Sequence, residues 1–279
     1  MATWVITRLT FRQAARRKIL LAALALGALF LGVYGLGLYF IQRDMAGYTT
    51  GQRLIMRNEA YNFMALAGLY VVNFLFTMMT VLTSVDTISG EIDVGTIHTL
   101  ASKPVHRREI VLGKWLGFVG MLTLYLLLMA GGVMGLTTLI TDYKVPNAWR
   151  GLVLMWLSGQ LLLSVTLLVG TRLSTLANGV LVFALYGVAF LGGWVEQIGS
   201  FLENQTAVNI GILSSLLMPS EALWKRAAYE MRSAVVDAFG FSPFTSVSSI
   251  PSPAMIIYAV LYTLAALALA VRTFSRRDL

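Results

Sequence analysis

Long stretches without a charged side chain are the feature that most limits how this chain can fold. Of its 279 residues, 57% are hydrophobic and only 12% are charged, which is about half the charged share of a soluble domain. So few charges cannot cover a surface that faces water. An uncharged run of about 20 apolar residues is also longer than the amphipathic helices of soluble cores. The sequence therefore predicts a protein that crosses a membrane several times.

Charged residues divide the chain into six such runs. They are Ile19–Ile41, Tyr61–Val85, Trp115–Thr141, Gly151–Thr171, Leu173–Val195 and Ala254–Val271. The first run would form a helix about 35 Å long, enough to cross a hydrocarbon core of about 30 Å with some tilt. Only Arg172 separates the fourth run from the fifth, so we expect a tight helical hairpin, with turn-forming residues at Asn178 and Gly179. We predict an all-α polytopic fold with six transmembrane helices, in one domain that covers residues 1–279.

The distribution of Lys and Arg predicts the orientation of this fold. Segments on the side of the N-terminus carry more basic residues than segments on the other side, and basic residues favour the cytoplasmic face. We therefore expect a multi-pass protein of the cell (inner) membrane with both termini in the cytoplasm. Contact with anionic lipid also accounts for the net charge of +8, so nucleic acid is not an expected partner.

Residues 1–18 are expected to form an interfacial helix at the start of the chain. Arg8, Arg12 and Arg16 recur at helical spacing and form one basic stripe, which could lie along the inner lipid headgroups. The apolar run that follows is too long for the core of a cleavable signal peptide. We interpret it as a retained first span.

The segment 86–110 is predicted to face the cytoplasm between the second and third spans. Ile88, Ile92, Ile97 and Leu100 can give a short helix an apolar side, and Pro104 can begin a second helix. A short amphipathic helix parallel to the membrane can dock into a groove on a soluble partner. An ordinary interfacial loop explains the same pattern, and the residues alone do not separate the two.

The spacing of several small and charged residues in this segment resembles a known family. The pattern comprises Gly90-Glu91, Gly95-Thr96, Pro104-Val105, Arg107-Arg108, Ile110 and Gly113-Lys114. It is similar to the inner loop of ATP-binding-cassette type 2 permeases, in particular the branch that includes the permease of the nitrous-oxide-reductase maturation transporter. In that family this segment is the coupling helix that inserts into the nucleotide-binding ATPase subunit. The resemblance implies that the ATPase-facing or loop-shaping positions are Glu91, Gly95, Thr96, Pro104, Arg107 and Arg108.

The resemblance also implies a function and a set of partners. Six spans are half of the usual transport unit, so we expect a homodimer with two ATPase subunits that works as an exporter. ATP and Mg would be held by the partner, because the one Gly-Lys pair here, Gly113-Lys114, is followed by Trp115 rather than by the Ser or Thr of a phosphate-binding loop. We expect no enzyme activity, cofactor or metal site in this chain. The alternative is a membrane scaffold or mechanotransmitter without transport, driven by the same type of ATPase, for example in maturation of an extracytoplasmic metalloprotein.

The long segment 196–253 before the last span is predicted to be an external helical loop. Its second helix should start near Pro219, with Ser220 as N-cap, Glu221 at the positive end of the helix dipole, and an apolar stripe along one side. The stripe comprises Leu223, Ala227, Met231 and Val235. The segment could cap the outer mouth of the dimer, act as a substrate gate or dock an extracytoplasmic partner. Because the six runs contain no ionisable side chain, we expect neither a proton-driven carrier nor an ion channel.

Overall fold

The computed structural model describes residues 2–90, 106–233 and 250–276. Every regular element in these ranges is an α-helix, and six helices are long and apolar enough to cross a membrane. This confirms the predicted all-α fold with six spans. The six are α2 (Lys18–Asp44), α3 (Gly51–Ser84), α6 (Arg107–Thr141), α7 (Ala148–Gly170), α8 (Thr175–Phe201) and α11 (Pro253–Ser275).

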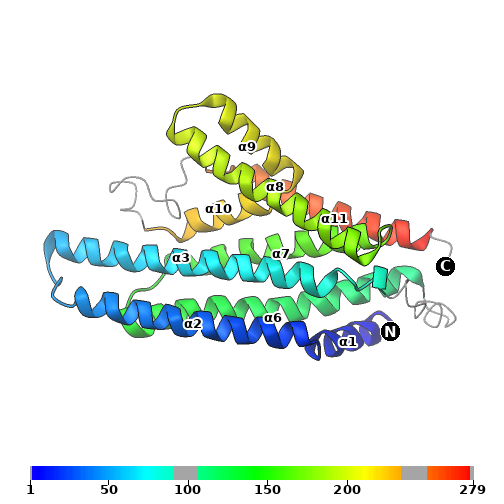
Figure 1. Cartoon of the computed structure of the whole chain (residues 1–279), viewed down its shortest axis with the longest axis horizontal. Coiled ribbons are helices and arrows are strands. Elements are labelled where there is room, and N and C mark those ends of the chain that lie inside the picture. Colours follow the sequence, from blue (N-terminus) through cyan, green and yellow to red (C-terminus); the bar gives the residue numbers. More distant parts are fainter. Residues whose placement is uncertain (1, 91–105, 234–249, 277–279) are drawn as a thin grey trace.

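The long helices α2, α3, α6 and α7 run side by side along the length of the molecule (Figure 1). Both chain termini lie at one end of this bundle (Figure 1), which we call the terminal end; the opposite end is the distal end. Since α3 has 34 residues and α6 has 35, each is about 50 Å long and must extend beyond a hydrocarbon core of about 30 Å. Both helices begin earlier than the uncharged runs from which they were predicted.

The N-terminal helix α1 (Ala2–Ala15) packs against α6. Glycines on α6 allow the two backbones to approach: a Cβ at Gly113 would lie 2.8 Å from the Cβ of Ile6, and a Cβ at Gly117 would lie 2.7 Å from that of Thr10. Ile6 faces Gly113, and Thr10, four residues later, faces Gly117, four residues later. Helix α1 therefore runs in the same direction as α6. The chain therefore begins with a helix, Ala2–Ala15, whereas an interfacial helix over residues 1–18 along the lipid headgroups stays a prediction.

The turn between the fourth and fifth spans lies at residues 171–174. Helix α7 ends at Gly170 and α8 begins at Thr175, so the tight hairpin predicted around Arg172 is confirmed. The prediction of turn chemistry at Asn178 was wrong, because Asn178 is buried inside the first turns of α8. Its side-chain amide donates to the carbonyls of Val85, at 2.9 Å, and Thr166, at 3.1 Å. Asn178 therefore ties the start of α8 to α3 and α7.

The segment before the last span folds back along the bundle. Helix α8 continues through Glu196 to Phe201, and it is followed by α9 (Gln205–Leu217) and α10 (Ser220–Met231), which are bent by 107° at the break between them. Helix α9 lies against α8, where Gly211 meets Glu196, and α10 lies against α7, where Met231 meets Gly151. We call this pair the α9–α10 hairpin.

Both ends of the α9–α10 hairpin lie toward the distal end, and its bend lies level with the middle of α7. The hydroxyl of Ser158, about halfway along α7, donates to the carbonyl of Ser220 at 3.5 Å. The hairpin therefore folds back along the bundle, and its bend of 107° fits either a re-entrant loop or a broken span. Its external position stays a prediction. Ser220 is the first residue of α10, whose N-cap is Pro219, and the predicted apolar stripe of α10 is buried at Leu223, Ala227 and Met231. Val235 lies outside the described residues.

Candidate functional site

Only the two flanks of the predicted coupling segment 86–110 are described. Four of its six predicted site residues, Glu91, Gly95, Thr96 and Pro104, lie outside the described residues. Arg107 and Arg108 form the first turn of α6, where Arg107 is half-buried and Arg108 is exposed. The backbone N–H of His106 donates to the Glu109 carboxylate at 3.2 Å, which stabilises this start of the helix.

The stretch Val85–Gly90, which leads into the coupling segment, is held by side chains from several helices. We call this stretch, together with the side chains of Arg17, Lys114, Thr175 and Asn178, the anchor cluster. The Arg17 guanidinium pairs with the Asp86 carboxylate at 2.5 Å and donates to the Thr83 carbonyl at 3.1 Å. Arg17 lies at the break between α1 and α2. The ion pair thus joins that break to the end of α3.

Lys114 is the most buried cation of the anchor cluster. Its side chain comes from α6 and is only 4% exposed, and its ammonium donates to the Thr87 carbonyl at 2.7 Å. A buried ammonium is tolerated where hydrogen bonds replace its hydration. Lys114 therefore links the coupling segment to α6. The sequence contained Lys114 only as part of the family pattern, and no local signal showed its partner.

The start of α8 completes the anchor cluster. The hydroxyls of Ser89 and Thr175 are hydrogen-bonded at 2.9 Å, and the Asn178 amide reaches the Val85 carbonyl. Ile88, one of the residues predicted for the apolar side of the coupling segment, is buried against the core. The anchor cluster thus connects the α1–α2 break, α3, α6, α7 and α8. A displacement of the coupling segment would act on all of these helices.

A second polar cluster lies between α8 and the α9–α10 hairpin. The Lys225 ammonium of α10 and the Glu196 carboxylate of α8 form an ion pair at 2.9 Å, with side chains only 7% and 6% exposed. Glu221, one turn before Lys225, is 5% exposed. We call Glu196, Glu221 and Lys225 the hairpin cluster. The sequence did not predict this cluster, because the fifth uncharged run was ended at Val195, whereas α8 continues through Glu196 to Phe201.

Further polar groups lie close to the hairpin cluster. A cavity of about 190 Å³ is lined by Glu196, Ile212, Ser215, Ala222, Ile250, Pro251, Ser252 and Met255. Within the described ranges, the hydroxyl of Ser215, which lines this cavity, and that of Ser220 are buried without a hydrogen-bond partner. Buried polar groups normally have partners. Polar groups without partners, next to a cavity, are what a path for a polar ligand or water would offer.

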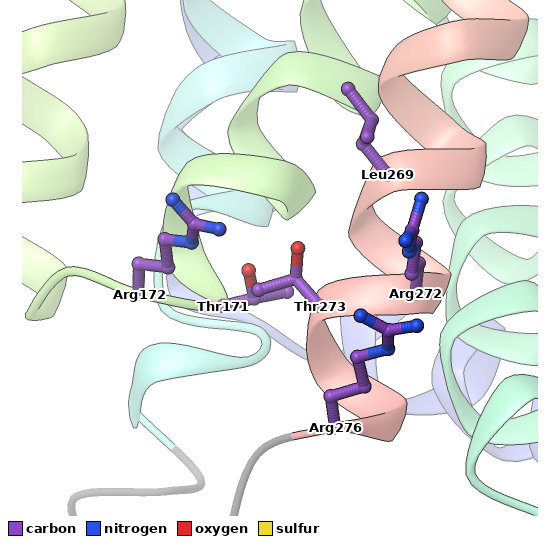
Figure 2. Close-up of a pocket in the computed structure, with 6 residues that line it drawn as sticks. All are labelled: Thr171, Arg172, Leu269, Arg272, Thr273 and Arg276. Atoms are coloured by element: carbon purple, nitrogen blue, oxygen red, sulfur yellow. The ribbon is translucent and has the colours of Figure 1, made fainter.

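A larger cavity, of about 680 Å³, opens at the terminal end between the α7–α8 turn and the last turns of α11. It is lined by Thr171, Arg172, Leu269, Arg272, Thr273 and Arg276 (Figure 2). We call it the arginine cavity. The sequence placed these arginines only as basic flanks of two spans. Their convergence depends on the packing of α11 against α7.

These features define a polytopic membrane protein with a helical bundle, a connecting segment between α3 and α6 that is tied into the bundle at the terminal end, and the α9–α10 hairpin, which folds back from the distal end. The family model described as ABC-2 family transporter protein matches residues 4–279, and the chain belongs to this family. It is a membrane component of an ABC system, and its family pairs with a nucleotide-binding ATPase subunit. No curated protein matched the chain. The resemblance to type 2 permeases is thus confirmed, while the narrower branch stays a prediction.

Proposed function

We propose that this chain is the permease subunit of an ABC exporter, in which ATP hydrolysis by a separate nucleotide-binding subunit drives movement of a substrate across the membrane. The observation that carries the proposal is the anchor cluster. It joins the coupling segment to five parts of the bundle through the contacts of Arg17, Lys114, Ser89 and Asn178. Such a connection is what a transmission between a soluble ATPase and membrane helices requires.

In the proposed cycle the ATPase binds the coupling segment in the cytoplasm. Glu91, Arg107 and Arg108 contact the partner, while Gly95, Thr96 and Pro104 shape the backbone. ATP and Mg are bound by the ATPase alone. Closure of the ATPase subunits displaces the coupling segment, and the anchor cluster passes this displacement to α3, α6 and α8 as a rigid-body tilt.

The proposal includes a homodimer with both termini in the cytoplasm. Helices α2 and α11 have largely exposed apolar surfaces, for example at Leu29, Leu36 and Leu261. Such surfaces face lipid or a second copy of the chain. An extracytoplasmic partner on residues 196–253 remains a prediction. The α9–α10 hairpin, with its buried charges, would line the distal half of the path.

Co-purification with the candidate ATPase tests the proposal. We expect wild type to retain the ATPase and a Glu91→Arg/Arg107→Glu variant to lose at least about 90% of it, because two charges at the contact are reversed. The matched control is Arg43→Glu/Asp44→Arg, a charge reversal at exposed positions of the distal end, which should retain the ATPase. Equal retention by the folded Glu91→Arg/Arg107→Glu protein would contradict the coupling assignment.

Transport is separated from the scaffold alternative by a second measurement. The complex is reconstituted into vesicles, and ATP-dependent movement of candidate substrates is followed together with ATPase activity. Flux that stops with the Glu91→Arg/Arg107→Glu variant would support the exporter. ATP turnover coupled to the chain without any flux would support the mechanotransmitter.

A further inference from the structure

The arginine cavity collects positive charge that the rest of the described structure does not neutralise. Arg172 comes from the α7–α8 turn, and Arg272 and Arg276 come from successive turns of α11 (Figure 2). In the described part of the chain, none of the three has an acidic partner. Three guanidinium groups around one cavity will favour an anion there.

Helix ends do not account for these arginines. Cations are favoured near the last carbonyls of a helix, but backbone groups already serve many of these carbonyls. The N–H of Arg276 donates to the carbonyls of Arg272 and Thr273, and the N–H and hydroxyl of Thr171 donate to those of Leu167 and Leu168. The arginine side chains are consequently not needed to cap α7 or α11, and their guanidinium groups are available to a ligand.

Hydroxyl groups and apolar surface complete the cavity. The hydroxyls of Thr171 and Thr273 lie between Arg172 and Arg272 (Figure 2). The hydroxyl of Thr273 also lines the cavity and can donate to an anion there. On the membrane side the wall is Leu269, which is 49% exposed.

An apolar track leads from the cavity along α11. Leu261, Ala265 and Leu269 are exposed at spacings of four residues on this helix, so they share one face that leads toward Arg272 and Arg276. A soluble anion would gain nothing from this track. An acyl chain would bury against it while its phosphate lies among the arginines.

We propose that the arginine cavity is a binding site for the phosphate headgroup of an anionic lipid, with an acyl chain along Leu269, Ala265 and Leu261. Basic pockets between membrane helices bind such headgroups. The site lies beside the α7–α8 turn, where Arg172 is six residues before Asn178, the residue whose contacts tie α8 to the anchor cluster. A bound lipid would therefore brace α11 against the turn from which α8 starts. The inference requires only that the chain spans a membrane, and it stands independently of exporter function.

Lipid retention by the purified full-length chain tests this site. The chain is titrated in detergent with phosphatidylglycerol, with phosphatidylcholine and with inorganic phosphate, and bound lipid is counted by native mass spectrometry. We expect tight retention of phosphatidylglycerol alone and at least about tenfold weaker retention by Arg172→Gln/Arg272→Gln/Arg276→Gln, because each basic contact contributes to headgroup binding. The matched control removes three positive charges at the distal end and should bind like wild type. It carries Arg43→Gln, Arg53→Gln and Lys144→Gln.

Two further arms identify the ligand. Leu269→Gln should weaken phosphatidylglycerol several-fold, and inorganic phosphate at millimolar concentration should not displace the lipid. Displacement by phosphate would show that the cavity binds soluble phosphates and would contradict the lipid site. Undiminished lipid binding by the triple variant would overturn the proposal. Loss of the ATPase with undiminished lipid binding would assign the cavity to the partner protein instead. Should the triple variant not fold, Arg172→Gln/Arg276→Gln with a salt titration makes the same test, since headgroup attraction is screened by salt.

Discussion

The anchor cluster and the hairpin cluster use the same chemistry in opposite environments. In the anchor cluster, Arg17 and Asp86 form an ion pair whose side chains are 29% and 42% exposed. In the hairpin cluster, Lys225 and Glu196 form an ion pair whose side chains are 7% and 6% exposed. Water and salt screen the first pair, and the protein excludes both from the second. The two ion pairs should therefore contribute very differently to stability, and the anchor cluster should be the easier of the two to rearrange.

The largest effect is expected for Lys225→Met. This change leaves Glu196 and Glu221 buried without a cation, which costs about 3–5 kcal/mol. Thermal unfolding of the purified chain in detergent should show the loss. A double variant, Glu196→Gln/Lys225→Met, should recover much of the stability, because only one buried carboxylate then remains. If Lys225→Met unfolds at the wild-type temperature, the pair is not buried as described.

An intermediate effect is expected for Lys114→Met. The change removes the donor to the Thr87 carbonyl from a site that is 4% exposed, and a hydrogen bond from a charged donor contributes about 1.5–3 kcal/mol. We expect the ATPase still to bind, while the response of its activity to the membrane subunit falls. Lys144→Met, at an exposed distal position, is the control. If the ATPase activity still responds to the Lys114→Met subunit as it does to wild type, Lys114 does not transmit movement of the coupling segment to α6.

The smallest effect on stability is expected for Arg17→Gln. A half-exposed ion pair contributes about 0.2–1 kcal/mol and less at high salt. The shift in unfolding temperature should be small and should shrink further as salt rises. A loss as large as that of Lys225→Met would show that the anchor cluster is shielded from water, and the contrast between the two clusters would then fail.

Much of the fold followed from local patterns. Uncharged runs located all six spans, because each helix that crosses the membrane must itself be apolar over about 20 consecutive residues. The apolar stripe of Leu223, Ala227 and Met231 also located α10. Helix ends were less accurate, since α3 and α6 extend beyond the hydrocarbon and their outer turns obey no apolar requirement. Glu91, Gly95, Thr96 and Pro104 stay predictions, because they lie outside the described residues.

The polar contacts could not be predicted in the same way. Glu196 and Lys225 are separated by 29 positions, Arg17 and Asp86 by 69, and Asn178 and Val85 by 93. A charged residue at the edge of an apolar run usually faces water or headgroups, and only a partner from a distant helix changes that. The hairpin that supplies Lys225 can reach Glu196 because Gly193 and Gly211 allow close packing of α8 with α10 and α9.

By itself, the sequence determined that this chain spans a membrane six times as helices, because the bilayer penalises every uncompensated charge and unpaired backbone group along a span. Its inner-loop pattern pointed to the family that the match over residues 4–279 then established. Only the tertiary structure decided which charges are buried, where the α9–α10 hairpin lies and which arginines share a cavity. These outcomes depend on contacts between residues far apart in the chain, and local patterns carry no information about such contacts.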